Sequence, residues 1–518
     1  MLGTRPSLAE LAGERWDLIV IGGGITGAGV LLEAMRLGKK VLLLEQGDFA
    51  SGTSSRSSKM VHGGLRYIAQ GDVRLTRDAL HERERLLRNL PGLVERATYL
   101  FPLRKGRFPG RLAMTLVLGL YDFLAGIRDH RFLTRAELLR RVPGLSDAQL
   151  DGAMSYTDAL TDDCRLVMRA LLEACRLGAG ALNYARVTDI HREGGVFQLQ
   201  VTDRHSDSTA TLGAARVINA TGAWAQRLGG DAQRIRPLRG SHLFVSHERL
   251  PVADCLTVMH PRDGRPVFVF PWEGVTCVGT TDLDHEENLD SEARASSAEV
   301  DYLLELVNDQ FPNAGISRAD LLSTLAGVRP VIASGRGRDP SRERRDHAVW
   351  EHQGVISVSG GKLTTFRLIA LDALAAAGLL DKRALRRARR SNAPLFQPLD
   401  GAPQQVDHFL HARQDDEALL RWCLGNEAVV HLDDLLLRRT RLGLLRADGG
   451  AALAPQLRDL TADTLGWDEA RWQSEWQRYL DIRRQYYSVP EDGVPEDGVP
   501  EDGAPANDAT SDTAPVSP

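Results

Sequence analysis

The sequence is poor in the features that build disulfide-rich, metal-binding and membrane-spanning proteins. Its five cysteines lie far apart and form no Cys-x-x-Cys pair. This spacing argues against a disulfide framework, a zinc ribbon and an iron–sulfur cluster, and it favours a reducing compartment. No apolar run approaches the roughly 20 residues needed to cross a bilayer, and no export signal opens the chain. We therefore expect no metal site, no export and no membrane span.

Lysine is also scarce, since only six of the 64 basic residues are lysines, so a lysine inside a motif attracts attention. The net charge of −5 is misleading, because residues 489–518 carry eight acids and no base. Subtracting these eight from the 69 acids leaves 61 against 64 bases, so the rest of the chain is mildly basic. The sequence shows no basic surface interleaved with aromatic residues, so we do not expect nucleic-acid binding.

A strand is predicted over 16–21, followed by a glycine-rich turn and a helix over 25–37. Further strands are predicted along the chain, among them 41–44 and 243–246. The run G-x-G-x-x-G places Gly22 at the tight turn, Gly24 where backbone approaches a pyrophosphate, and Gly27 where the helix packs on the strand. The next apolar run ends in Glu45, which is placed to accept ribose hydroxyl groups. The motif predicts a dinucleotide site for FAD or NAD. Its position at the start of the chain favours FAD, and the acid disfavours NADP.

Further motifs resemble those of the FAD-dependent, quinone-linked glycerol-3-phosphate dehydrogenases. The most specific are Ser-Ser-Lys…His-Gly-Gly-Leu-Arg-Tyr and Gly-Gly-Lys-Leu-Thr-Thr, and the resemblance covers about residues 16–485. It rests on residues 53–67, 219–224, 239–242, 279–282, 327–330 and 360–366, and more weakly on 437–440.

The resemblance implies an α/β fold. An FAD-binding Rossmann-like domain of the glutathione-reductase and D-amino-acid-oxidase type is interleaved with a mixed-sheet substrate domain over residues 16–392. Three prolines and a glycine in 393–403 predict a linker, and a small helical domain is expected over 393–487. The acidic tail, 488–518, repeats Val-Pro-Glu-Asp-Gly three times and is predicted to be disordered.

The activity implied is oxidation of sn-glycerol 3-phosphate to dihydroxyacetone phosphate. Hydride leaves C2 for flavin N5, and electrons then pass to a membrane quinone. Three alternatives stay open: an oxidase that uses oxygen with the same substrate, an amine or amino-acid oxidase of the same fold, and a flavin-binding protein without catalysis.

A substrate that carries a phosphate needs permanent cations, and the planar fork of arginine binds phosphate oxygens in pairs. The family places such arginines at Arg66, Arg329 and Arg345. Tyr67 and Thr280 are predicted to hydrogen-bond the substrate.

The predicted catalytic residues are His242, Arg329 and Lys362. His242 is the candidate base for the C2 hydroxyl, because histidine titrates near neutral pH. His62 competes for that role, and transfer assisted by arginine or lysine is a third possibility. Lys362 follows two glycines at a helix start, where it is expected to stabilise negative charge on the reduced flavin.

Other residues are expected to line the flavin. Hydroxyl side chains can donate to phosphates, and a strand that ends in small residues lets backbone approach the cofactor. The predicted contacts are Thr53, Ser54, Ser55, Ser58, His62, Gly63, Ala220, Thr221, Gly222, Gly360, Gly361, Leu363 and Thr364.

Two basic stretches predict contact with a membrane surface. Residues 104–111 are basic and precede an apolar run, 112–120, that is too short to span a bilayer. Residues 382–390 contain six cations in nine positions. We expect a cytoplasmic protein that lies peripherally on anionic lipid at the inner face of the cell membrane, with a homodimer as a further expectation. Alternatively, both stretches are solvent-exposed faces without a membrane role, or the first belongs to a helix of the protein core.

Overall fold

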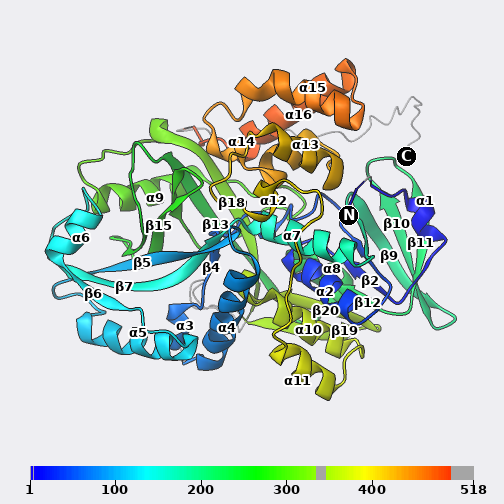
Figure 1. Cartoon of the computed structure of the whole chain (residues 1–518), viewed down its shortest axis with the longest axis horizontal. Helices are drawn as coiled ribbons and strands as arrows, with labels where there is room; N and C mark the ends of the chain where they lie inside the picture. The colour runs from blue at the N-terminus through cyan, green and yellow to red at the C-terminus, as the bar shows by residue number, and fades with distance from the viewer. Residues whose placement is uncertain (1, 4, 70, 334–345, 492–518) are drawn as a thin grey trace, which may run out of the picture.

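The computed structural model describes residues 2–3, 5–69, 71–333 and 346–491. Two large sheets and a group of helices near the C-terminus form this part of the chain (Figure 1). Along the sequence, segments of one large sheet lie between segments of the other. The predicted α/β architecture with two interleaved domains is therefore confirmed.

The first sheet has six strands in the order β19-β20-β12-β2-β3-β8. Five strands pair in parallel, and β19 runs antiparallel at the edge. Helices α2, α7 and α10 cover one face and a four-stranded sheet covers the other, so β2 and β3 are buried on both faces and apolar throughout. The bounds are β2 Leu18–Ile21, β3 Val41–Leu44, β8 Gly180–Leu182, β12 Val217–Asn219, β19 His347–His352, β20 Val355–Gly360, α2 Ile25–Arg36, α7 Asp163–Arg176 and α10 Phe366–Ala376.

The turn from β2 into α2 requires its glycines. Gly22 has φ +113°, and a Cβ there would lie 2.5 Å from the carbonyl oxygen of Ala220. A Cβ on Gly27 would lie 1.8 Å from the carbonyl oxygen of Gly22. Only glycine therefore allows this tight turn and the close approach of the helix to the strand.

The second large sheet is mixed. Eight of its ten strands follow the order β17-β13-β16-β15-β14-β5-β7-β4, and the other two, β18 and β6, pair with β13 and β7. The pairing is antiparallel except between β14 and β5. The strands are β4 Met60–Val61, β5 Val94–Arg104, β6 Arg131–Thr134, β7 Leu150–Thr161, β13 Ile235–Ser246, β14 Cys255–Met259, β15 Pro266–Trp272, β16 Val275–Gly279, β17 Leu283–Asp284 and β18 Leu321–Ile332.

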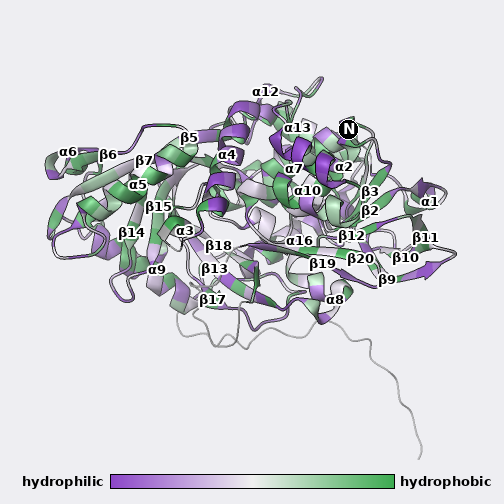
Figure 2. Ribbon diagram, turned by 90° about the horizontal axis from the view of Figure 1, so that it is seen from below, coloured by the Kyte–Doolittle hydropathy of each residue, from purple (hydrophilic) through white to green (hydrophobic). Residues whose placement is uncertain are grey.

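The two large sheets lie toward opposite ends of the molecule, with the four-stranded sheet outermost at its end (Figures 1 and 2). That small sheet comprises β1 Arg15–Trp16, β9 Ala185–Glu193, β10 Val196–Asp203 and β11 Thr209–Ala214. The helices packed around the ten-stranded sheet are α3 Leu65–Ala69, α4 Val73–Asn89, α5 Arg111–Ala125, α6 Arg135–Arg141 and α9 Ser297–Gln310.

The residues after α11 (Lys382–Arg390) are helical, as predicted for the C-terminal part. They form α12 Gln404–Asp407, α13 Glu417–Asn426, the π-helix η7 Asp434–Arg439, α14 Leu442–Leu445, α15 Ala454–Leu465 and α16 Glu469–Tyr486. Nearly all of the tail predicted to be disordered lies outside the described residues. Within the described ranges, no helix has both the length and the apolar character needed to span a bilayer.

Candidate active site

A cavity of about 1630 Å³ joins the two large sheets. Its lining includes Gly22, Glu45 and Thr221, which follow strands of the six-stranded sheet, together with Arg329 of β18 and Lys362, which follows β20. Sites for drug-sized ligands usually measure about 300–1,000 Å³, so this cavity has room for a dinucleotide together with a small substrate.

The glycine-rich end has the features of a phosphate site. Helix α2 begins after Gly24, which provides no side-chain cap, and the N-terminus of a helix favours an anion. The N–H of Ile25 donates to Ser54 Oγ at 3.0 Å, which ties the Thr53–Ser55 turn to the helix start. A Cβ on Gly24 would lie 3.0 Å from that same oxygen. A side chain at Gly24 would therefore crowd the Ser54 hydroxyl, and both residues line the cavity.

Glu45 lines the cavity and holds the turn. Its two carboxylate oxygens accept the N–H groups of Gly23 at 2.6 Å and of Gly47 at 2.9 Å. Burial raises the pKa of Glu45, and these two hydrogen bonds oppose the increase. Its predicted contact with ribose hydroxyls stays a prediction.

The predicted serine and threonine contacts separate into two groups. Thr53, Ser54 and Ser58 line the cavity, whereas Ser55 is buried beneath it and its hydroxyl donates to the Gly52 carbonyl at 3.4 Å. The Thr53 hydroxyl donates to the carbonyl of Val328 at 2.5 Å, which joins this turn to strand β18. Other predicted contacts that line the cavity are His62, Ala220, Thr221, Gly222, Gly360, Gly361, Leu363 and Thr364.

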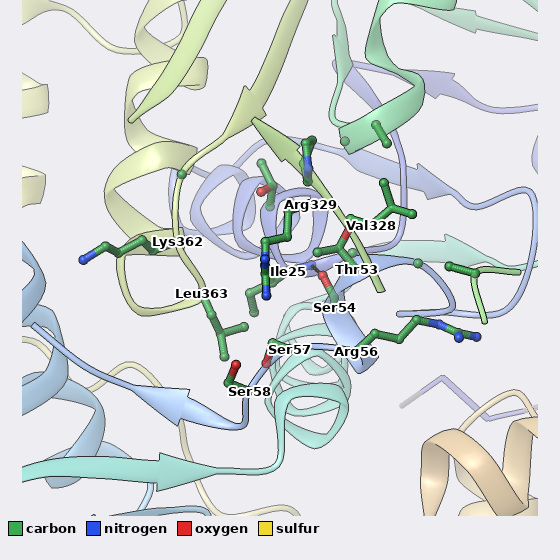
Figure 3. A pocket seen from close by; sticks show the side chains of 18 of the residues that line it. Ile25, Thr53, Ser54, Arg56, Ser57, Ser58, Val328, Arg329, Lys362 and Leu363 are labelled. Carbon is green, nitrogen blue, oxygen red and sulfur yellow. Dashed lines mark hydrogen bonds between the residues drawn. The ribbon is translucent and has the colours of Figure 1, made fainter. Parts of the chain in front are cut away.

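Arg329 enters the cavity from β18 (Figure 3). Its guanidinium donates to Asp282 at 2.9 Å and to the hydroxyl of Thr280 at 2.8 Å. These bonds fix the plane of the guanidinium, which lines the cavity. Asp282 and its role in orienting Arg329 were missed from the sequence, although it closes the Gly-Thr-Thr-Asp motif.

Lys362 extends from the turn after β20, away from Arg329 (Figure 3). Its Nζ donates to the carbonyl of Gly63 at 3.2 Å and lies 3.8 Å from the centre of the Tyr67 ring. Gly64 has φ +83°, and a Cβ there would lie 2.2 Å from the ring and 2.5 Å from Nζ. Gly64 lines the cavity where Gly63 was predicted to do so.

His242 lies behind the cavity wall, with an exposed fraction of 1%. Its Nε2 is 3.0 Å from Ser58 Oγ, and Ser58 does line the cavity. Burial, followed by the charges of Arg329 and Lys59, lowers the pKa of His242 to about 3. The imidazole is therefore neutral at physiological pH, and it contacts the cavity lining through the Ser58 hydroxyl.

A buried ionic network under the cavity was not predicted. Asp163 accepts from Lys59 Nζ at 2.7 Å and from Arg441 at 2.7 Å. Asp48, in the loop after Glu45, accepts from Arg439 at 2.7 Å. Burial alone would raise the pKa of Asp163, but the two cations bring it below its ordinary value. The only sequence signals were a rare lysine and the weak match at 437–440.

Two predicted substrate arginines are not placed. Arg345 lies outside the described residues, and so does the side chain of Arg66, whose backbone belongs to α3.

The fold and the glycine-lined cavity define a class of protein. Residues 17–424 match the family of FAD-dependent oxidoreductases, and residues 392–472 match the C-terminal domain of alpha-glycerophosphate oxidase. The chain belongs to the FAD-dependent oxidoreductases, whose cofactor fits the cradle that the glycines leave beside the α2 N-terminus.

Within this class the relatives are aerobic glycerol-3-phosphate dehydrogenases, and the chain belongs to that family. The protein of Staphylococcus saprophyticus is 36% identical over 385 residues, which is 72% of this chain and 68% of the relative. The Staphylococcus aureus protein is 35% identical, over 70% of this chain and 67% of the relative. A glycerol-3-phosphate dehydrogenase from Bacillus halodurans, solved with FAD, is 27% identical with a TM-score of 0.71, covering 92% of this chain and 96% of that one.

Proposed function

We propose that the chain oxidises sn-glycerol 3-phosphate to dihydroxyacetone phosphate. The observation that carries this proposal is one cavity that joins the glycine-rich phosphate cradle to the cations Arg329 and Lys362. Relatives at 35–36% identity that are named for this activity support it.

A bound FAD would supply the acceptor for the hydride that leaves C2 of the substrate. The chain supplies binding and charge. We propose that Arg329, held by Asp282 in the cavity lining, binds the substrate phosphate, with Thr280 beside it. Arg66 and Arg345 complete the predicted clamp. Lys362 is proposed to stabilise negative charge that develops on the cofactor, at the turn that opens α10.

The proton of the C2 hydroxyl needs an acceptor. His242 is neutral and is in contact with Ser58, so we propose that Ser58 relays the proton to Nε2. His62 lines the cavity directly and remains the competing acceptor. The low pKa of His242 makes it a weak base, so this relay is expected to depend on the developing negative charge of the substrate oxygen.

We further propose a peripheral position on the inner face of the membrane, with quinone as the electron acceptor. Helix α5 presents Leu112, Leu116 and Phe123 to solvent with exposed fractions of 75%, 67% and 79%. The opposite side of the same helix supports the cavity through Met114 and Val117. An apolar helix face that is exposed on one side and borders the cavity on the other is suited to lie in lipid and receive an apolar acceptor.

Oxygen is a second candidate for the acceptor. The C-terminal helices match a family named for an oxidase, alpha-glycerophosphate oxidase. Peroxide formed stoichiometrically with product under air, without added quinone, would favour the oxidase.

The substrate is tested by adding sn-glycerol 3-phosphate anaerobically to the FAD-loaded protein and following the visible flavin band. Rapid bleaching is expected in the wild-type protein. Arg329→Ala should lower kcat/KM about 10- to 100-fold, because a charge-assisted hydrogen bond contributes roughly 1.5–3 kcal/mol.

Arg135→Ala is the matched control, since Arg135 is an exposed arginine of α6 that pairs with Asp147 and does not line the cavity. No bleaching of wild-type protein that holds FAD would overturn the substrate assignment. Equal rates in all three proteins would overturn the role of Arg329.

A further inference from the structure

A second cavity, of about 270 Å³, lies between the end of α4 and the segment that follows α11. Arg85, Arg88, Asn89 and Asn392 line it, and none of these residues lines the large cavity. Every lining side chain in the described part of the chain is a guanidinium or an amide. Such a lining offers many hydrogen-bond donors and no negative charge.

Arg85 is buried without adequate compensation. Its exposed fraction is 8%, and within the described chain its Nε has no hydrogen-bond partner. The carboxylate of Glu82 is 3.4 Å away, but that carboxylate already accepts two hydrogen bonds from Arg367, at 2.9 and 2.8 Å. A buried donor without a partner is costly, so a group that accepts from Arg85 would stabilise the fold.

The charge around the cavity is positive. Burial, and then the charge of Arg367, lowers the pKa of Arg85, with Arg88 adding to the effect and the carboxylates of Glu82 and Glu33 opposing it. The C-terminus of α4 contributes about half a negative charge, which is less than the two full charges of Arg85 and Arg88. Helix α11, with six cations, ends at Arg390, two residues before Asn392. The field therefore favours an anion.

The wall that carries Asn392 is held in place. Asn89 Nδ2 donates to the Arg85 carbonyl at 2.7 Å, and Asn89 Oδ1 accepts from the N–H of Leu395 at 2.6 Å. Arg36 of α2 donates to the carbonyls of Pro394 and Leu395. The segment after α11 is thus fixed against α4, and the cavity is part of the folded structure.

We propose that this cavity binds an oxyanion of the phosphate type. Arginine forks match the geometry of phosphate oxygens, and the volume is about nine times the ~30 Å³ share of one water molecule. The anion is either free phosphate or the phosphate of a lipid headgroup. Helices α5 and α11 lie along the same lower edge in Figure 1, with α4 between them, so a lipid surface that contacts α5 would be near this site. The proposal does not depend on the substrate of the large cavity.

The test uses the FAD-loaded full chain and two substitutions of exposed lining residues, Arg88→Gln and Asn392→Asp. Arg77→Gln is the control, because Arg77 is an exposed arginine of the same helix that lies outside the cavity. Calorimetry with inorganic phosphate should show binding about tenfold weaker in Arg88→Gln and lost in Asn392→Asp. Arg77→Gln should match the wild type. Phosphate binding in the large cavity is common to all four proteins and cancels in the comparison.

Co-sedimentation with vesicles separates the two sources. The vesicles contain phosphatidylcholine alone, or phosphatidylcholine with phosphatidic acid. If only Arg88→Gln and Asn392→Asp lose binding to the acidic vesicles, the site takes a lipid headgroup. If they lose phosphate binding but keep vesicle binding, it takes free phosphate. Equal phosphate affinity in all four proteins would overturn the site, and turnover of glycerol 3-phosphate, measured in the same samples, reports separately on the large cavity.

Discussion

At the scale of single residues, the active-site end of the cavity depends on close packing around Gly64. Its positive φ and its contacts leave no space for a Cβ, because the Tyr67 ring and Lys362 Nζ occupy that volume. Lys362 is therefore positioned by a glycine as much as by its own hydrogen bond to the Gly63 carbonyl.

Replacing Gly64 by alanine should displace Tyr67 and Lys362 and lower turnover. Strain at a positive φ costs about 1 kcal/mol or more, and misplacement of a catalytic group by about 1 Å can cost on the order of 100-fold in rate. Steady-state kinetics and thermal unfolding of the FAD-loaded variant measure the two effects. Gly71→Ala is the control for backbone strain alone, because Gly71 has φ +84° but a Cβ there would meet nothing within 4 Å. Equal turnover in both variants would contradict the packing argument.

At the scale of elements, the C-terminal helices hold the loops around the large cavity through buried ion pairs. The π-helix η7 supplies Arg439 to Asp48, and Arg441, two residues further on, reaches Asp163 beside Lys59. Removing one partner of a buried ion pair leaves an uncompensated charge, whose cost is about 3–5 kcal/mol.

Arg439→Met should lower the free energy of unfolding by roughly 3 kcal/mol, the lower end of this range, because Arg438 still pairs with Asp48. The variant should also hold FAD more weakly, since Asp48 lies in the loop after Glu45. Urea unfolding and fluorescence titration of the apoprotein with FAD measure these changes. Arg446→Met is the matched control, because Arg446 is half-exposed and pairs with Asp415 and Asp448 at the surface. FAD affinity equal to that of the control would contradict a role of the Arg439–Asp48 ion pair in holding FAD.

The same elements show what the sequence could predict. Strands β2 and β3 and helix α2 were predicted nearly to the residue, because their signals are local runs and periodicity. Strand β13 was predicted only at 243–246, since its polar first half, 235–242, is fixed by pairing with β18, whose Cα partners lie about 80–100 residues away. The Asp48–Arg439 pair spans 391 residues, and a sequence pattern does not report such contacts. Likewise, the sequence alone does not show which of Gly63 and Gly64 lines the cavity, because that depends on where Tyr67 and Lys362 lie.

At the scale of the whole molecule, Glu273 joins the ten-stranded sheet to the C-terminal helices. Its carboxylate accepts from the His411 N–H at 3.1 Å and from Gln414 Nε2 at 2.8 Å. Burial raises the pKa of Glu273 to about 7, although these two hydrogen bonds act to lower it. The folded chain therefore favours the protonated carboxyl, and this contribution to stability is fully present below the unfolded pKa of about 4.3 and is lost as the pH rises to about 7.

Glu273→Gln should remove this dependence. The difference in unfolding free energy between wild type and variant is expected to change by about 2 kcal/mol between pH 5 and pH 8, with the wild type losing stability at the higher pH. Urea midpoints at the two pH values measure it. A difference that stays constant with pH would contradict the raised pKa.

The interleaving of the two large sheets sets the order in which the protein can acquire its cofactor during synthesis. The strands around the glycine turn come from residues 18–44, 180–182, 217–219 and 355–360, and the arginines that clamp the loops follow at 438–441. A ribosome that adds about 5–20 residues per second exposes the first glycine turn many seconds before the last wall of its cradle. Nascent chains that stop before about residue 441 should be colourless, so the yellow colour marks a translated and folded C-terminus.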